Sequence, residues 1–173
     1  MRAQAILFAV LCFGSGSAGA LYNPAPDAGL AAVQGEWTGT LTYRDYEKPD
    51  KMVTLPTKLF IALGAPNELV LHFAYDDGPS KTVYSYERMQ FDFSAKQLTW
   101  SSLGDEDPPT KCRISEEAQE QPAGRRMTCE QADKGKVERY ELVLTPQRLT
   151  ISKEEIDAAG KSVLRNRYQF SRK

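Results

Sequence analysis

Histidine and cysteine are scarce in this chain of 173 residues, which contains one histidine, His72, and three cysteines. The Gly-x-Ser-x-Gly nucleophile motif, glycine-rich phosphate loops and Cys-x-x-Cys pairs are absent. The acidic pair Asp76-Asp77 and the acidic run 105–107 lack the ligand spacing of a calcium loop. The sequence therefore predicts no enzyme activity, no metal site and no cofactor, although carboxylates brought together only by folding would leave no motif.

Long apolar runs and an excess of charge of one sign are also missing. The chain has 22 basic and 23 acidic residues, and its formal net charge is −1. This balance argues against a nucleic acid or an anionic membrane surface as the partner. One apolar run is present, residues 5–13, and it is too short to cross a bilayer permanently. We therefore expect no integral membrane segment in the mature chain.

The first residues have the three-part pattern of a secretory signal peptide. Arg2 precedes the apolar run, and small residues follow it up to Ala18-Gly19-Ala20. We therefore place a signal peptide at 1–20 and expect an exported protein, either periplasmic or secreted. Leu11 disfavours lipid attachment at the adjacent Cys12, where a small residue would be expected. The rest of the chain is interpreted as an extension with a short helical turn, 21–34, and one domain, 35–173.

Signal cleavage would leave two cysteines, Cys112 and Cys129, in an exported chain. An even pair in an oxidising compartment predicts a disulfide bond. Each cysteine lies in a short strand-like run, with a polar connection between the two runs. A redox-active or metal-binding pair is the alternative, but the chain has no Cys-x-x-Cys spacing and no neighbouring histidine. We therefore interpret the disulfide as structural.

Most of the chain after residue 34 alternates apolar and polar residues, as strands with one buried face do. Glycine, proline, asparagine and aspartate separate about nine or ten such runs. The connections are too short for parallel crossovers, and a closed barrel removes exposed sheet edges. The pattern therefore predicts an all-β, antiparallel up-and-down β-barrel of about 8–10 strands in a single domain. A β-sandwich is the alternative.

The start of this domain resembles the lipocalin and calycin barrels. Gly35-Glu-Trp37 follows a short helical turn and opens the first strand, as the Gly-x-Trp motif of that group does. The resemblance implies that Trp37 closes one end of the barrel beneath a basic residue from the last strand, either Arg165 or Arg167. It also implies an interior that binds an apolar or aromatic small molecule. The Asp-Tyr signature found between later strands of lipocalins is absent.

The aromatic residues concentrated in the first half of the chain are candidates for lining such an interior. The predicted ligand-binding residues are Trp37, Tyr43, Phe73, Tyr75 and Tyr86.

A barrel of this size can also be filled by its own side chains. Thr57 and Glu87 share strand faces with apolar residues, which favours a wet or ligand-bearing interior. The sequence thus leaves two functions open. One is binding of a small hydrophobic ligand inside the barrel. The other is an interaction or inhibitor module with a filled barrel, which contacts a protein partner through the loops 104–109 and 112–129.

Overall fold

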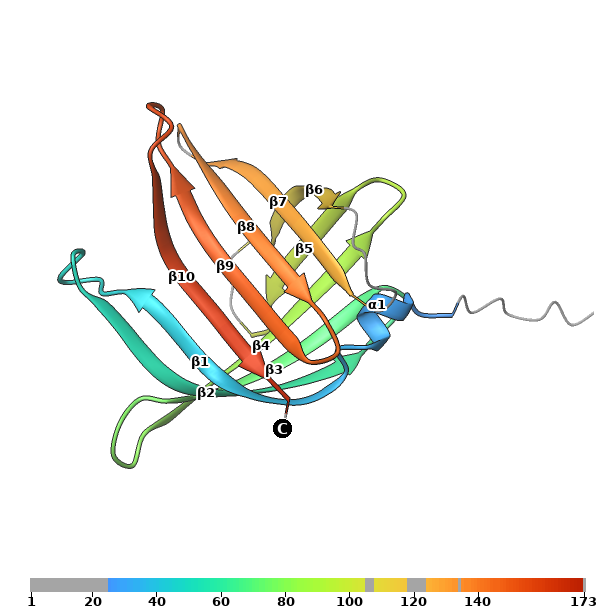
Figure 1. Ribbon diagram of the computed structural model, residues 1–173, viewed down its shortest axis with the longest axis horizontal. Coiled ribbons are helices and arrows are strands. Elements are labelled where there is room, and N and C mark those ends of the chain that lie inside the picture. Colours follow the sequence, from blue (N-terminus) through green and yellow to red (C-terminus); the bar gives the residue numbers. More distant parts are fainter. Residues whose placement is uncertain (1–24, 105–107, 118–123, 134, 173) are drawn as a thin grey trace, which may run out of the picture.

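The computed structural model describes residues 25–104, 108–117, 124–133 and 135–172. The predicted signal peptide, its cleavage site and the acidic run 105–107 lie outside these residues. The described chain forms a short helix and ten strands that close into one antiparallel barrel (Figure 1). Each strand pairs with its neighbours in sequence, and the first strand pairs with the last. This confirms the predicted up-and-down barrel and excludes the sandwich.

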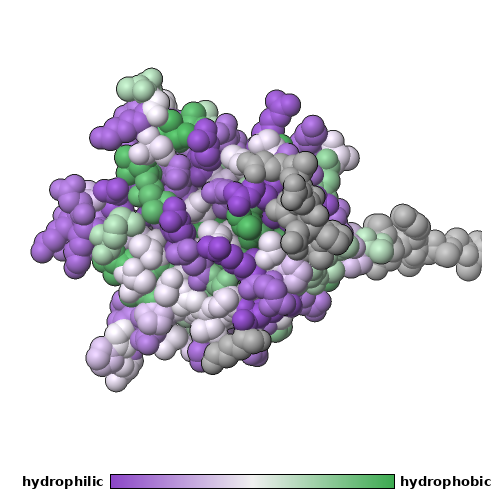
Figure 2. All heavy atoms as spheres, in the orientation of Figure 1, coloured by the Kyte–Doolittle hydropathy of each residue, from purple (hydrophilic) through white to green (hydrophobic). Residues whose placement is uncertain are grey.

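The helix α1 spans Ala28–Ala31 and precedes all of the strands. The strands are β1 (Gly35–Arg44), β2 (Met52–Leu63), β3 (Glu68–Asp76), β4 (Thr82–Asp92), β5 (Gln97–Ser102), β6 (Thr110–Glu117), β7 (Arg125–Asp133), β8 (Lys136–Leu144), β9 (Arg148–Ile156) and β10 (Ser162–Ser171). Hydrophilic residues cover much of the face seen in Figure 2, with small separate apolar areas between them.

The buried core fills the half of the barrel next to α1. It combines Leu30 and Val33 from the helical segment with inward-facing side chains of every strand. Its largest fully buried side chains include Trp37, Phe73, Leu59, Met89 and Leu142. Burial of this apolar surface supplies the main driving force for closing the sheet. This half of the interior is therefore occupied by the protein itself.

Trp37 closes the barrel at the α1 end. Its indole N–H donates to the carbonyl of Val33 at 2.9 Å, and its side chain is buried. The guanidinium carbon of Arg172 lies 4.4 Å from the centroid of the Trp37 ring, a cation–π arrangement. Arg172 also donates to the carbonyl of Gln34. The end of the barrel thus has the Trp-under-arginine arrangement that the Gly-x-Trp resemblance implied.

The arginine itself differs from the two that we expected. β1 and β10 are antiparallel, and Thr38 pairs with Ser171 while Thr42 pairs with Arg167. The residue next to Trp37 across this seam is therefore Arg172, which directly follows Ser171 at the end of β10. Arg165 and Arg167 lie toward the opposite end of the barrel, so the expected barrel-closure role of these two residues has to be corrected.

Gly39 allows β1 and β10 to approach closely at this seam. A Cβ atom at this position would lie 1.9 Å from the carbonyl oxygen of Gln169 and 2.8 Å from the Cα of Phe170. Both atoms belong to the backbone, so no side-chain rotation could relieve the clash. Only a residue without a Cβ fits this position.

We expect Gly39→Ala to lower the free energy of unfolding by about 2 kcal/mol, because the β1–β10 ladder must separate locally to admit the methyl group. Urea unfolding followed by circular dichroism measures this change. Thr40→Ala, at the next position with its side chain on the outer face, serves as the control and should change stability by less than about 0.5 kcal/mol. Equal stabilities of the two variants would show that the seam has more room than its geometry indicates.

Asp27 connects the helix α1 to the strand β7. Its Oδ1 accepts the backbone N–H groups of Gly29 at 3.0 Å and Leu30 at 3.1 Å, so Asp27 is the N-cap of α1. Arg125 donates from Nε to the same oxygen at 2.8 Å and forms an ion pair with the carboxylate. The hydrogen bond from Arg125 and those from the helix hold the pKa of Asp27 below its ordinary value of 3.8, against the opposing effect of burial.

This pKa shift predicts an acid-sensitive contribution to stability. Because the folded-state pKa of Asp27 is lowered, its contribution is present above the unfolded value of 3.8 and is lost as the pH falls through the folded value. We expect Asp27→Asn, which keeps a capping oxygen, to cost about 1 kcal/mol near neutral pH. The difference from the unmodified protein should shrink toward zero as the pH falls through the lowered folded-state pKa of Asp27. Urea unfolding at several pH values tests this, and a difference that is independent of pH would contradict it.

The predicted disulfide is present between Cys112 in β6 and Cys129 in β7. The two Cα atoms lie 5.5 Å apart, and the residues are separated by 17 positions in the chain. Cys129 pairs across the ladder with Ile114, so the bond runs diagonally between the two strands. Both cysteines are buried and belong to the core. The disulfide therefore ties together two strands whose connection, 118–123, lies outside the described residues.

Candidate functional site

The inward-facing side chains change in character along the barrel axis. Starting from the α1 end, β8 and β9 each present two aliphatic residues, then a tyrosine or a lysine, and then a glutamate. These inward series are Leu144, Leu142, Tyr140 and Glu138 on β8, and Leu149, Ile151, Lys153 and Glu155 on β9. The apolar part of each series contributes to the core, and the polar part lines the other half of the barrel.

Solvent reaches this other half. Leu142 is 0% exposed and Ile151 is 1% exposed, whereas the side chains of Lys153 and Glu155 remain 25% and 26% exposed. These side chains point inward and still contact solvent, so the end of the barrel opposite α1 is accessible to solvent. We call this region the open half. It is defined by the inward-facing residues Leu41, Tyr43, Leu55, Tyr75, Ser85, Glu87, Trp100, Gln131, Lys136, Glu138, Tyr140, Lys153, Glu155, Arg165 and Tyr168.

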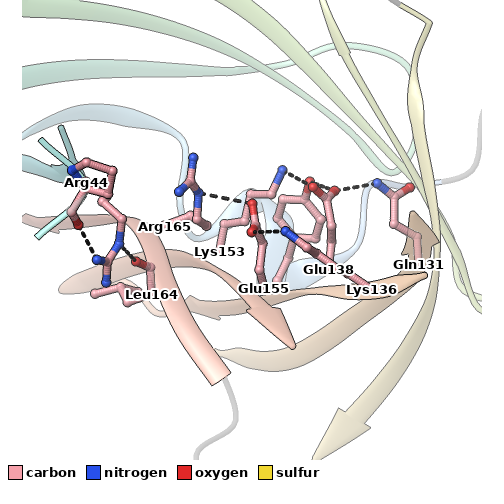
Figure 3. A network of polar contacts seen from close by, with 10 residues as sticks. Arg44, Gln131, Lys136, Glu138, Lys153, Glu155, Leu164 and Arg165 are labelled. Carbon is pink, nitrogen blue, oxygen red and sulfur yellow. Dashed lines mark hydrogen bonds and ion pairs between the residues drawn. The ribbon is translucent and has the colours of Figure 1, made fainter. Parts of the chain in front are cut away.

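Glu138 is the best-satisfied carboxylate of the open half. It accepts hydrogen bonds from Gln131 at 2.7 Å and from the hydroxyl of Tyr140 at 3.0 Å. Lys153 forms an ion pair with it at 2.5 Å, and the ammonium group of this lysine also lies 5.4 Å from the centroid of the Tyr140 ring. Figure 3 shows Gln131 of β7 and Lys153 of β9 converging on Glu138 of β8. The glutamate is therefore held in place by residues from three strands.

The pKa values of this group reflect both its burial and its contacts. Burial alone would raise the pKa of Glu138, but hydrogen bonds from Lys153, Gln131 and Tyr140 hold it below its usual value. For the lysine, burial alone would lower the pKa of Lys153, but the contact with Glu138 raises this pKa above its usual value. Both groups are therefore charged near neutral pH. The pKa of Tyr140 is raised by burial, which keeps its hydroxyl protonated and able to donate.

Glu155 forms a second ionic group closer to the rim. It lies 3.1 Å from Nε of Arg165 and 3.3 Å from Nζ of Lys136 (Figure 3). The register of β9 and β10 shifts between Leu164 and Asn166, so Arg165 is the extra residue of a β-bulge. Nε of Arg44 donates to the carbonyl of Leu164 at 3.3 Å. Through this hydrogen bond, Arg44 of β1 contacts the bulge.

The strands β1 to β3 form a more apolar wall, which adjoins this network where β1 pairs with β10. Leu41 and Leu55 pack against the core from these strands. The hydroxyl groups of Tyr75 and Tyr168 lie 3.1 Å apart and hydrogen bond to each other. Burial raises the pKa of Tyr75 to about 12, and it raises the pKa of Tyr168 as well. Both tyrosines therefore stay neutral, and their rings extend the apolar wall.

Glu87 lies between these two walls, on β4. It accepts a hydrogen bond from the indole N–H of Trp100 at 2.6 Å and one from the hydroxyl of Ser85 at 3.1 Å. The Trp100 ring lies 5.7 Å from the Tyr140 ring, which links this group to the charged network. The charge of Glu87 acts on Tyr75 and Tyr168 and helps to raise their pKa values. This glutamate therefore belongs to the open half, as its position among apolar residues in the sequence suggested.

The structure does not bring the five predicted ligand-binding residues together. Trp37, Phe73 and Tyr75 belong to the buried core, with Tyr75 at its boundary with the open half, whereas Tyr43 is half-buried. Tyr86 cannot line the interior, because it is on the outer face of β4 and is 49% exposed. A ligand cavity between Trp37, Phe73, Tyr75 and Tyr86 is therefore excluded by the packing.

Tyr86 instead stacks on His72, the single histidine. The two ring centroids lie 4.3 Å apart and the rings are nearly parallel, at 7°. These residues pair directly across β3 and β4, and Tyr84 lies next to them on the same outer face. His72 is therefore part of an aromatic group on the outer face and not of the open half.

Sequence reasoning missed the charged network of β7 to β10. The alternation from Glu138 through Tyr140 to Leu142 and Leu144 does carry a signal, because it puts a glutamate on the face of two core leucines. The same alternation on β9 puts Lys153 on the face of Ile151. Arg165 carries no such signal, because only the bulge turns it toward Glu155.

Comparisons with known proteins support the fold. No protein-family model matches this chain, and no curated protein matches its sequence. Among solved structures, Rv2717c from M. tuberculosis superposes with a TM-score of 0.56 at 10% sequence identity, and the match covers 83% of this chain and 94% of that one. A Nostoc punctiforme protein of unknown function from the DUF3598 family gives a TM-score of 0.45 at 14% identity, covering 90% of this chain and 53% of that one. The likeness to Rv2717c extends to the barrel fold alone.

The described residues show neither a metal-binding cluster nor a membrane-spanning helix. They contain no group of three or more histidine, cysteine, aspartate or glutamate side chains placed to hold a metal ion. No helix within the described ranges is both long and apolar enough to span a membrane.

Proposed function

We propose that this chain is an exported binding protein that holds a small amphipathic molecule in the open half of its barrel. The observation that carries the proposal is the solvent exposure of inward-facing charged side chains, with Lys153 and Arg165 at 25% and 34%. A barrel filled only for stability would bury apolar side chains at these positions, since burying charge is costly. Such an opening with apolar and polar walls has the composition of a ligand site.

The two walls support a ligand with two kinds of surface. The rings and aliphatic side chains of β1 to β3 suit an apolar or aromatic body, and the charged groups of β8 to β10 suit a polar end. The proposal refines the small hydrophobic ligand expected from the sequence. The Gly-x-Trp resemblance to lipocalin and calycin barrels supports it, since that group uses the barrel interior for ligands.

The signal-peptide pattern of residues 1–20 and the Cys112–Cys129 disulfide support export to the periplasm or secretion. We propose binding rather than catalysis, because the sequence has none of the nucleophile or phosphate-loop motifs considered above. The alternative interaction module would use the loops 104–109 and 112–129, which fall partly outside the described residues.

The proposal can be tested with a neutral fluorescent probe, N-phenyl-1-naphthylamine. We expect it to bind the mature protein at one site and to brighten as it enters the apolar wall. Ser85→Trp, which places an indole in the open half, should weaken binding about tenfold or more by occupying the site. Tyr84→Trp changes the adjacent residue on the outer face of the same strand and should leave binding unchanged. Circular dichroism of both variants verifies the fold, and unchanged binding by Ser85→Trp would rule out the open half as the site.

A further inference from the structure

Arg165 has unused hydrogen-bonding capacity inside the open half. Its Nε lies 3.1 Å from Glu155, and its side chain is 34% exposed. Among the described residues, its two terminal amines have no hydrogen-bond partner. A guanidinium carries five N–H donors in a planar fork that matches the geometry of a carboxylate. Arg165 can therefore keep its contact with Glu155 and still bind a second anion through its terminal amines.

The carboxylates nearest Arg165 are already paired with cations. Among the described residues of β8 to β10, three cations face two carboxylates inside the barrel: Lys136, Lys153 and Arg165 against Glu138 and Glu155. Both carboxylates already contact cations, as Figure 3 shows. Glu87 on β4 is a third carboxylate of the open half: its charge acts on Tyr168 of β10, and its partner Trp100 lies 5.7 Å from the Tyr140 ring. The three cations of the open half thus balance its three carboxylates, and Arg165 is the cation whose terminal amines are left to bind a further anion.

The position of Arg165 also orients the ligand. The bulge lies beside β1, where Asn166 pairs with Tyr43 near the rim of the barrel. From this point the apolar wall, which includes Leu41 and Leu55, extends inward toward the Tyr75 and Tyr168 rings. A molecule with its anionic end at the bulge would therefore place its apolar body against this wall.

We infer that the ligand of the open half is an amphipathic carboxylate whose carboxylate group binds the terminal amines of Arg165. This inference rests on the proposed function and names the class of ligand for the same site. Arg165 acts as a specificity-determining residue, because it distinguishes ligands by their polar end. The apolar body of the ligand contacts the wall formed by β1 to β3. Lys153 of β9 is paired with Glu138 and is a second cation on the strands β8 to β10.

The experiment compares three probes with one carbon skeleton, 4-phenylbutanoate, 4-phenylbutan-1-ol and 4-phenylbutylamine. Each probe is titrated against the mature protein loaded with N-phenyl-1-naphthylamine, and displacement gives its affinity. We expect the carboxylate to bind about tenfold to a hundredfold more tightly than the alcohol, the range for a charged hydrogen bond. The amine should bind most weakly.

Substitutions on β10 assign the preference to one residue. Arg165→Met should remove the advantage of the carboxylate over the alcohol, and circular dichroism verifies that the variant folds. Arg165→Lys keeps the charge and should retain part of the advantage. Arg167→Met is the matched control, because Arg167 is two residues away on the same strand and pairs with Thr42 and Ser152, outside the charged network. It should behave like the unmodified protein.

The other outcomes separate the inference from the proposed function. If all three probes displace N-phenyl-1-naphthylamine equally, or the amine binds most tightly, the open half is a binding site but the carboxylate inference is overturned. The inference is also overturned if Arg165→Met keeps the full preference for the carboxylate. If N-phenyl-1-naphthylamine does not bind at all, the proposed function fails, and the inference fails with it.

Discussion

Replacement of Trp37 by alanine is expected to lower the free energy of unfolding by about 4 kcal/mol, the middle of the range for removing a buried aromatic side chain. The Trp37 side chain is 2% exposed and fills the barrel beneath α1. Alanine would leave a cavity there and would remove the donor to the Val33 carbonyl and the ring that contacts Arg172. Because Leu30 of α1 and Val33, two residues after the helix, pack on this end, the loss would also loosen the helix.

Urea unfolding followed by circular dichroism measures this change without relying on tryptophan fluorescence. Trp37→Phe separates two contributions, since phenylalanine refills most of the volume but cannot donate to Val33. Tyr84→Ala is the control for removal of an aromatic ring, because Tyr84 is 59% exposed on the outer face. It should cost less than about 1 kcal/mol. Equal losses for Trp37→Ala and Tyr84→Ala would show that the packed end contributes little to stability.

Removal of the disulfide is expected to cost about 3 kcal/mol, because a cross-link across 17 positions restricts the unfolded chain. The change is made with the double variant Cys112→Ala/Cys129→Ala. Both cysteines are buried in the core, so a small part of the loss would come from the missing sulfur atoms. The measurement is again the free energy of unfolding in urea.

Dithiothreitol provides an internal comparison for this prediction. Reduction should lower the stability of the unmodified protein to nearly that of the double variant, whereas the double variant should not respond. If the unmodified protein is equally stable with and without the reductant, the bond does not stabilise the fold. A response of the double variant would show that the reductant acts elsewhere.

The strand pattern was predictable because it depends on local chemistry. Alternation of apolar and polar residues, as in β1 from Trp37 to Tyr43, places one face of a strand in the core regardless of which strands lie beside it. Gly64, Gly78 and Gly160 lie in the connections between strands, where the turn residues of the sequence indicated them. Because each run is joined to the next by a short turn, the antiparallel pairing of strands that are neighbours in sequence was predictable as well.

The proposed binding site was predictable only in part, because it depends on register and on barrel position. Tyr75 and Glu87 were recognised as inward-facing, but Tyr86 was assigned to the wrong face of β4. Whether an inward residue lies in the packed half or the open half depends on its height along the barrel axis, which separates Phe73 from Tyr75. Composition also cannot reveal that the charged positions of β8 and β9 face one another.

By itself, the sequence determined the all-β class, the antiparallel order of the strands and the disulfide pair, because alternation, turn residues and the number of cysteines are local properties. Only the tertiary structure decided that Arg172 covers Trp37 and that Arg165 turns inward. The first depends on the register between the first and last strands, and the second on a bulge of one residue. Both are set by contacts between residues far apart in the chain, for which no short sequence pattern exists.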